Sequence, residues 1–143
     1  FRRVLFRSEF CNIVSSPLLS SQNNTISVHK SLCSSFKTTK PQWYIILIDE
    51  QKVGYIRTSS DSGETICIGC DIHPDHRRKG YAKTAYSKFM TSLYERGYLV
   101  IWLEVFRDNI PAFNLYKQLG YIEIGSRTIN EKEYVLMVHR REN

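Results

Sequence analysis

Apolar residues alternate with polar ones, or cluster, in six short segments of the chain, and turn-forming residues bound each segment. This pattern is typical of β-strands. It predicts strands at residues 43–48, 53–57, 64–72, 99–105, 121–124 and 133–138. A polar turn at 49–52 joins the first two segments, so they are expected to form a hairpin. The third strand should end at His73 and Pro74, because proline cannot continue a central strand.

Three segments follow the helical period instead, with apolar residues at positions i, i+3, i+4 and i+7. Residues 80–96 show this spacing most clearly, and Gly97 follows as a C-terminal stop. Near the N-terminus, residues 26–36 carry spaced apolar residues after Thr25, which is a suitable N-cap. A short helix is therefore predicted there as well.

The last predicted helix begins at Asp108 or Asn109, which can cap its first turn, and ends at Gly120. The predicted order is helix, three strands, helix, strand, helix and two strands. Such an order predicts an α+β fold with a central mixed sheet of about six strands flanked by helices. The 143 residues suit one domain, 1–143. Residues 1–10 contribute little to the fold prediction, because they could be either additions to the natural chain or the remnant of a truncated first element.

The composition does not change the predicted fold, but the net charge indicates what kind of partner the protein binds. Hydrophobic residues make up 42% and charged residues 24%, which is ordinary for a soluble protein. No apolar run is long enough to span a membrane, so no membrane partner is expected. The net charge of +6 favours an anionic partner, such as nucleic acid, an acidic surface or a phosphorylated cofactor, although it also fits a soluble basic surface.

The four cysteines show no spacing typical of a disulfide framework, which favours a reduced, cytoplasmic protein. Cys67, Cys70, His73 and His76 recur every three residues, and these residue types can hold zinc. However, Cys67 and Cys70 should point to opposite faces of one strand unless a bulge near Gly69 realigns them. No metal is therefore expected, and a covalent step at Cys70 is not favoured either.

The most informative segment is Arg77-Arg78-Lys79-Gly80-Tyr81-Ala82, between a predicted strand and a predicted helix. A helix N-terminus leaves backbone N–H groups unpaired and carries partial positive charge, so it can bind phosphate. Gly80 has no Cβ and lets the backbone approach such a ligand closely. The segment therefore predicts a site for a phosphate-bearing ligand.

Two motifs in order carry a resemblance to a known family. The first is Arg77-x-x-Gly80-x-Ala82, preceded by Ile72-His73-Pro74, and the second is Leu103-Glu104-Val105 followed by Asn109-x-x-Ala112-x-x-x-Tyr116-x-x-x-Gly120-Tyr121. Over about residues 43–138 the chain resembles the GNAT superfamily of acyl-CoA-dependent N-acyltransferases, with some similarity to the branch that acetylates protein N-termini. This resemblance implies a GNAT-like mixed sheet and acetyl-CoA as co-substrate, without a metal. The family begins with a further strand, for which the sequence shows no clear counterpart.

The resemblance also assigns roles to individual residues. It implies that acetyl-CoA is bound by Cys70, Asp71, Ile72, Arg77, Arg78, Lys79, Gly80, Tyr81, Ala82, Asn109 and Tyr116. Tyr116 matches the tyrosine that protonates the departing CoA thiolate, and Glu104 resembles the general base that acts on the acceptor amine. Each also has a structural interpretation, Tyr116 as a core tyrosine and Glu104 as a strand-end carboxylate.

Other candidates are weaker. Glu64, Asp71 and Asp75 are alternatives for the base. Aromatic residues at Trp43, Tyr44 and Tyr55 could line an acceptor pocket, but aromatics in strands more often belong to the core.

The expected activity is acetyl transfer from acetyl-CoA to a primary amine, by direct attack in a ternary complex. The expected acceptor is a small-molecule or peptide amine, and the expected assembly is a monomer or homodimer. One competing hypothesis is a basic nucleic-acid-binding module, which the lack of a recognised DNA- or RNA-reading motif disfavours. The other is a GNAT-like acyl-CoA binder without turnover.

Overall fold

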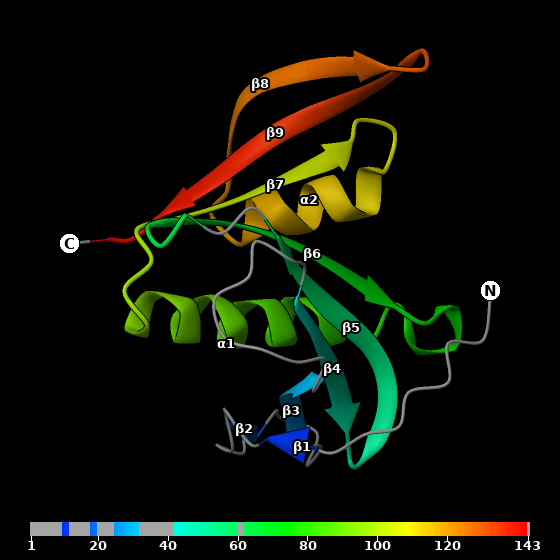
Figure 1. Ribbon diagram of the computed structural model, residues 1–143. Helices are drawn as coiled ribbons and strands as arrows, with labels where there is room; N and C mark the ends of the chain where they lie inside the picture. Colours follow the sequence, from blue (N-terminus) through cyan, green and yellow to red (C-terminus); the bar gives the residue numbers. More distant parts are fainter. Residues whose placement is uncertain (1–9, 12–17, 20–24, 32–41, 60–61, 143) are drawn as a thin grey trace.

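The structure is a computed structural model that describes residues 10–11, 18–19, 25–31, 42–59 and 62–142, with side chains described in the last two ranges (Figure 1). In chain order its strands are β1 (Phe10–Cys11), β2 (Leu18–Leu19), β3 (Thr25–Ser31), β4 (Gln42–Ile48), β5 (Gln51–Ser59), β6 (Thr65–Ile72), β7 (Val100–Phe106), β8 (Ile122–Ile129) and β9 (Lys132–Arg140). The helices are the 3₁₀ helix η1 (Pro74–His76), α1 (Tyr81–Glu95) and α2 (Ile110–Gln118).

The strands form one mixed sheet in the order β1-β3-β4-β5-β6-β7-β9-β8, and β2 pairs with β3. Neighbouring strands are antiparallel except β6 and β7, which are parallel and are connected through α1. Parallel strands need such a crossover, because a short hairpin can join only antiparallel ones. The predicted α+β class, with a mixed sheet and helices packed on it, is confirmed, and the six predicted strands correspond to β4 through β9.

The helix predicted at residues 26–36 is wrong. Thr25–Ser31 is strand β3, which pairs with β4 so that Ile26 lies opposite Ile48; residues 32–36 lie outside the described part of the chain. The segment begins with β-branched residues at alternate positions, Ile26 and Val28, which suit a strand. A helix of this length is only marginally stable in water without tertiary packing, whereas pairing with β4 gives the segment backbone hydrogen bonds to a neighbouring strand.

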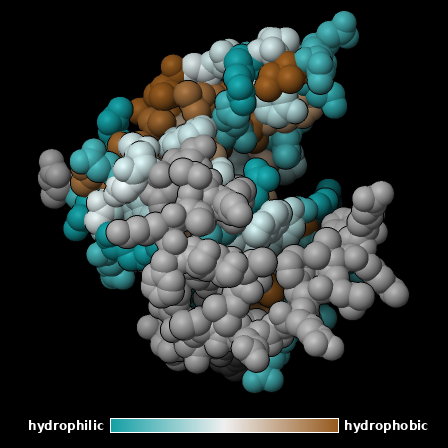
Figure 2. Space-filling view, in the orientation of Figure 1, coloured by the Kyte–Doolittle hydropathy of each residue, from teal (hydrophilic) through white to brown (hydrophobic). Residues whose placement is uncertain are grey.

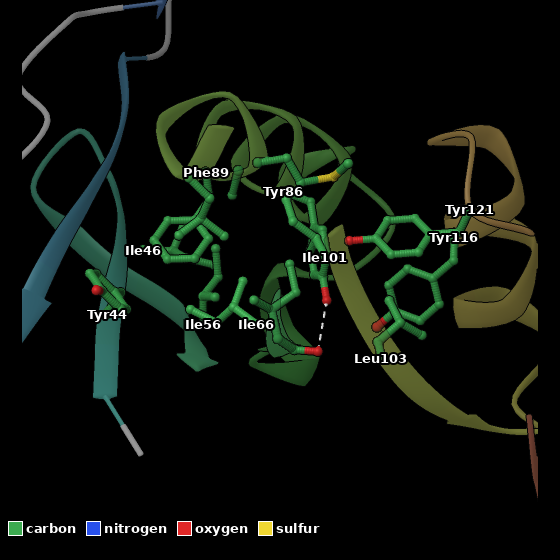
Figure 3. Packing of buried hydrophobic residues seen from close by; sticks show 14 of the residues in the cluster. Tyr44, Ile46, Ile56, Ile66, Tyr86, Phe89, Ile101, Leu103, Tyr116 and Tyr121 are labelled. Atoms are coloured by element: carbon green, nitrogen blue, oxygen red, sulfur yellow. Dashed lines mark hydrogen bonds between the residues drawn. The ribbon is translucent and has the colours of Figure 1, made fainter. Parts of the chain in front are cut away.

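Helices α1 and α2 pack into one hydrophobic core on the sheet (Figure 3). From α1, the predicted apolar face is buried through Ala85, Tyr86, Phe89, Met90 and Leu93. The sheet contributes alternate residues, including Ile68, Ile101 and Leu103, each at most 2% exposed. The helix limits also agree with the prediction, since Gly97 and Gly120 have φ values of +100° and +91° just beyond the two helices. Within the described residues, no helix is both long enough and apolar enough to cross a membrane.

A half-buried histidine ties the end of β9 to α1. The Tyr94 hydroxyl lies 2.5 Å from His139 Nδ1 and donates to the His139 carbonyl oxygen at 3.1 Å. Burial lowers the pKa of His139 below its ordinary value, and the nearby Glu142 carboxylate partly offsets this effect. The folded protein therefore favours neutral His139.

We expect this histidine to make stability depend on pH. A group with a lowered folded-state pKa contributes its stability above the unfolded pKa, about 6.5, and loses it as the pH falls through the folded value. When the pH is lowered from about 7.5 to about 5, the Tm of His139→Gln should therefore decrease less than the Tm of the wild type. Thermal unfolding followed by circular dichroism measures the Tm at each pH. The matched control is His73→Gln, because His73 is exposed. A His139→Gln protein that keeps the full wild-type loss would contradict the prediction.

Candidate functional site

The parallel pair β6 and β7 separates after three residues. Thr65–Cys67 pairs with Val100–Trp102, and no later residue of either strand pairs with the other. Each strand nevertheless stays in the sheet, because β5 pairs with β6 as far as Ile72 and β9 pairs with β7 as far as Phe106. Figure 1 shows the two ribbons diverging toward their C-terminal ends. Residues 68–72 of β6 therefore have an inner edge that pairs with no strand among the described residues, and we call this edge the β6 opening.

Alternate residues of β6 present their backbone groups to this opening. The His73 N–H donates to β5 at 2.8 Å, so by alternation the residues at 69 and 71 also face β5. Ile68, Cys70 and Ile72 consequently face the opening. The Ile68 carbonyl oxygen accepts a long hydrogen bond from the Tyr86 hydroxyl, at 3.4 Å. The N–H and C=O of Cys70 are thus placed to pair with an extended ligand, as an added strand would.

Arg77 fastens the basic segment to the end of β6. Its Nε donates to the Ile72 carbonyl oxygen at 2.8 Å, and its guanidinium pairs with the Asp71 carboxylate at 3.2 Å. Gly54 of β5 permits the strand end to sit here, because a Cβ at that position would collide with the Asp71 carbonyl oxygen. The charge of Arg77 is therefore already partnered, whereas the exposed Arg78 and Lys79 extend the cationic surface.

Helix α1 begins directly after Gly80, and its first amides have no capping side chain among the described residues. Gly80 adopts a left-handed conformation, with φ of +76°, and Arg78 does so as well, with φ of +62°. The first helical hydrogen bond runs from the Thr84 N–H to the Gly80 carbonyl oxygen, at 3.2 Å. The N–H groups of Tyr81 and Ala82 precede it and carry the positive end of the helix dipole. A Cβ at Gly80 would meet no atom within 4 Å, so the approach to these amides is open.

Tyr116 lies on α2 with 8% of its surface exposed, and its ring packs 5.4 Å from that of Tyr86 and 5.8 Å from that of Tyr121. Burial raises the pKa of Tyr116 to about 12, and the nearby Cys70 and Asp71 also raise it, while a hydrogen bond with Tyr86 lowers it. Tyr86, which packs against Tyr116, donates to the Ile68 carbonyl oxygen, and Tyr116 therefore lies close to the β6 opening. Because of its raised pKa, Tyr116 is a protonated donor at neutral pH.

Asn109 caps α2, because its side-chain oxygen accepts from the Ala112 N–H at 3.4 Å and Pro111 follows in the first turn. Of the two caps that the sequence allowed, Asp108 and Asn109, the structure uses Asn109. The cap fixes the start of the helix that carries Tyr116.

Glu104 follows Trp102, the last residue of β7 that pairs with β6, by two positions. It lies on the face of the sheet away from α1 and α2, because its neighbours Leu103 and Val105 point into the core. Its carboxylate accepts a hydrogen bond from the Arg127 guanidinium at 2.6 Å, and 27% of its side chain is exposed. The structure thus places Glu104 and Tyr116 on opposite faces of the sheet, at the level where β6 and β7 have separated.

The two cysteines of β6 also lie on opposite faces. Pairing between β5 and β6 runs without a register shift from Ile72 to Cys67, so no bulge at Gly69 realigns them. Cys70 packs against the core, where burial raises its pKa to about 12, whereas Cys67 lies near Glu104 on the other face. In the part of the chain with described side chains, no three His, Cys, Asp or Glu residues are grouped so as to hold a metal ion.

The aromatic trio named from the sequence divides between two places. Tyr44 packs in the core with its ring 4.6 Å from that of Phe89. Trp43 and Tyr55 contact each other at 5.0 Å on the opposite face, where Arg57 lies over the Trp43 ring. Of the three, only Trp43 and Tyr55 lie on the face of the sheet that bears Glu104.

Sequence reasoning did not single out Tyr86, which lies beside the candidate site. It appeared only as one of several apolar-face residues of the helix at 80–96, and the structure places it between β6 and Tyr116. Its polar atom at a core position of an amphipathic helix was the available signal.

Comparisons with known proteins show the family and the fold of this chain. Residues 9–121 match the sequence model of the acetyltransferase (GNAT) family. An acetyltransferase of Pectobacterium atrosepticum is 29% identical over 92 residues, which are 61% of this chain and 65% of that protein. A ribosomal protein bS18-alanine N-acetyltransferase of Haemophilus ducreyi is 33% identical over 80 residues, 56% of this chain and 53% of that protein. The chain thus spans between half and two thirds of these curated relatives.

Among solved structures, the fold is similar to that of a spermidine N-acetyltransferase from Vibrio cholerae in complex with CoA and spermine, with a TM-score of 0.64 and 20% identity. That match covers 70% of this chain and 65% of the other. A second similar structure is the N-acetyltransferase PseH of Campylobacter jejuni in complex with acetyl coenzyme A, with a TM-score of 0.63, 16% identity, and coverage of 71% and 69%.

Proposed function

Because the chain belongs to the GNAT acetyltransferase family, we propose that it transfers the acetyl group of acetyl-CoA to a primary amine by direct attack in a ternary complex. One observation carries the proposal. The uncapped start of α1 and Tyr116 both lie close to the unpaired edge of β6, because Arg77, just before α1, donates to Ile72 of that edge. Tyr116 packs against Tyr86, which donates to Ile68 of the same edge.

Acetyl-CoA supplies an activated thioester, and two parts of the chain are suited to hold it. The first amides of α1, with Arg78 and Lys79 beside them, would bind the pyrophosphate, because a helix N-terminus and nearby cations both favour negative charge. The Cys70 main chain would pair with the amide groups of the pantetheine arm, as a neighbouring strand would. In this assignment Arg77 holds the loop to β6 through Asp71 and Ile72 rather than binding phosphate itself.

Tyr116 is proposed as the acid that assists departure of the CoA sulfur. When the amine nitrogen bonds to the acetyl carbon, the carbon–sulfur bond breaks and the sulfur takes a proton. A hydroxyl with a pKa of about 12 gives a proton to a thiolate with a pKa of about 8.5 only at a cost in free energy. Burial raises the pKa of a thiolate too, so the gap narrows in the closed site.

Glu104 is proposed as the general base, acting on the acceptor amine through water. An amine attacks only when neutral, and deprotonation at pH 7 costs about 1 kcal/mol for an α-amino group and about 4.6 kcal/mol for a lysine-like amine. The Glu104 carboxylate accepts a hydrogen bond from Arg127 at 2.6 Å. An acceptor ammonium would therefore share the Glu104 carboxylate with the Arg127 guanidinium. A peptide α-amine needs least help and is the favoured acceptor, with small amines as the alternative. The cytoplasmic location and the monomeric or homodimeric state stay predictions.

Release of the CoA thiol tests the proposal. Purified protein with acetyl-CoA should release thiol faster when an acceptor is added, from a panel of a peptide with a free N-terminal alanine, the same peptide blocked and carrying one lysine, spermidine and an amino sugar. We expect the free peptide to give the largest increase. If CoA binds but no acceptor accelerates release, the protein is a binder without turnover. If CoA does not bind and an oligonucleotide binds in a steeply salt-dependent way, the basic surface serves nucleic acid instead.

A further inference from the structure

One row of residues crosses the sheet at the level where β6 and β7 have separated. Arg57 of β5 lies directly opposite Gly69 of β6. The last parallel pair joins Cys67 of β6 to Trp102 of β7, and two positions further along each strand stand Gly69 and Glu104. Gly69 therefore lies between a cation on one neighbouring strand and a carboxylate on the other.

Arg57 and Gly69 face the same side of the sheet as Glu104. The residues next to them along their strands point into the core and are buried, namely Ile56, Thr58 and Ile68. Burial is the main cause of the raised pKa of the Cys67 thiol, but Glu104 also raises it and Arg57 lowers it, so both charges act on this face. A Cβ at Gly69 would meet no atom within 4 Å. The space above this glycine is therefore open between the two charges.

The guanidinium of Arg57 is held but its charge is not paired. It lies over the Trp43 ring, 5.8 Å from the ring centre, and is exposed. Among the residues with described side chains, Arg57 forms no ion pair. Stacking on a ring uses the flat face of a guanidinium and leaves its N–H edge for a carboxylate. Arg127 differs, because it already donates to Glu104 at 2.6 Å.

A peptide acceptor can reach both charges at once. Neighbouring strands lie about 4.8 Å apart, so β5 is one such step beyond β6. One residue of an extended peptide spans about 3.5 Å, so the side chain of its second residue reaches the level of β5 when its amine lies between β6 and β7. The other edge of the sheet is apolar where β8 begins, with Ile122 and Ile124 57% and 53% exposed, and Figure 2 shows hydrophobic surface over β8.

We propose that Arg57 is a specificity-determining residue, and that the protein acetylates peptides whose free N-terminal residue is followed by an acidic residue. The amine lies near Glu104, the peptide backbone crosses above Gly69, and the acidic side chain accepts charge-assisted hydrogen bonds from Arg57. The inference rests on the proposed acetyl transfer and narrows its acceptor. Spermidine brings a cation to the same place and is therefore a poor acceptor.

Three peptides that differ only at their second residue test this role. Each starts with a free alanine, followed by glutamate, glutamine or lysine. We expect the wild-type kcat/KM to be about tenfold higher for the glutamate peptide than for the glutamine peptide, and lowest for the lysine peptide. Arg57→Gln should make the glutamate and glutamine peptides equal, and Arg57→Glu should favour the lysine peptide. The Kd for acetyl-CoA should stay within about twofold of wild type in both variants.

Two further variants serve as controls. Arg57→Lys keeps the charge and should retain part of the preference for glutamate. Arg140→Gln removes an exposed cation four residues along β9 from Leu136, the residue that pairs with Glu104, and should keep the full preference. Thermal unfolding reports whether loss of the contact with Trp43 destabilises the fold. Calorimetry with protein saturated with CoA measures the Kd of each peptide without turnover.

The outcomes separate the role of Arg57 from the proposed activity. If the wild type acetylates the glutamate and glutamine peptides equally well, the role of Arg57 is wrong and acetyl transfer stands. A preference for glutamate that persists in Arg57→Gln also overturns the role. If no peptide is acetylated but the wild type binds the glutamate peptide more tightly than the glutamine peptide, and Arg57→Gln does not, the role stands and the proposed activity is wrong. If no peptide is acetylated or bound, both are wrong.

Discussion

Replacing Tyr116 with phenylalanine should lower kcat by about 100-fold and leave the Kd for acetyl-CoA unchanged, because a general acid acts in the transition state and not on the bound donor. The ring keeps its core contacts with Tyr86 and Tyr121, so the Tm should change little. Burial raises the pKa of Tyr116 to about 12, and the hydroxyl is thus protonated in the wild type throughout the working range. The ratio of wild-type to variant kcat should therefore be the same at about pH 6 and about pH 9.

Steady-state kinetics with the best acceptor from the panel and calorimetry with acetyl-CoA measure the two quantities. Tyr121→Phe serves as the control for loss of a buried tyrosine hydroxyl near the same site. An unchanged kcat in Tyr116→Phe would remove the acid role and return Tyr116 to its interpretation as a core residue. A raised Kd with unchanged kcat would instead assign it to donor binding.

Replacing Gly80 with glutamate should abolish CoA binding. The side chain would place a carboxylate against the first amides of α1, where it repels the negatively charged pyrophosphate. This repulsion should weaken CoA binding by several kcal/mol, which raises the Kd by more than about 100-fold. The position offers room, since a Cβ there meets no atom within 4 Å. The left-handed φ of +76° adds strain of about 1–2 kcal/mol for any residue with a side chain. Calorimetry with CoA measures binding, and thermal unfolding measures the strain.

Gly97→Glu is the matched control at the other end of α1. Gly97 is also left-handed, with φ of +100°, and a Cβ there likewise meets no atom within 4 Å. A carboxylate suits the N-terminus of a helix better than its C-terminus. Gly97→Glu should thus be the less stable variant and yet keep CoA affinity. If Gly80→Glu still binds CoA, the proposed phosphate site is wrong. If both variants lose CoA binding, the loss results from damage to the fold and not from repulsion at the site.

Local patterns predicted the glycine turn at position 80 and a helix cap at Asp108 or Asn109, because turns and caps depend on residues within one or two turns of each other. The role of Tyr116 was implied by the resemblance to the GNAT family. The contacts of these residues were not predictable in the same way. Arg77 pairs with Asp71 and Glu104 pairs with Arg127, and the second pair joins separate strands. A sequence shows that charges exist but not which strands become neighbours.

The error at residues 26–36 has the same physical cause. A short segment with apolar residues at mixed spacing satisfies both the helical and the strand period. Pairing with the edge of β4 makes Thr25–Ser31 a strand rather than a helix. Tyr86 was not singled out because its neighbours Ile68 and Tyr116 come from a strand and from another helix.

The sequence by itself determined the strand–turn–helix order, the basic glycine turn before α1 and the helix that carries Tyr116, since each rests on backbone rules that act over a few residues. Only the tertiary structure decided that β6 and β7 part after three residue pairs, that Glu104 and Tyr116 lie on opposite faces of the sheet, and that Tyr86 contacts Tyr116. These features depend on how distant segments share hydrogen bonds and a core, and that sharing is fixed by the register and twist of the whole sheet.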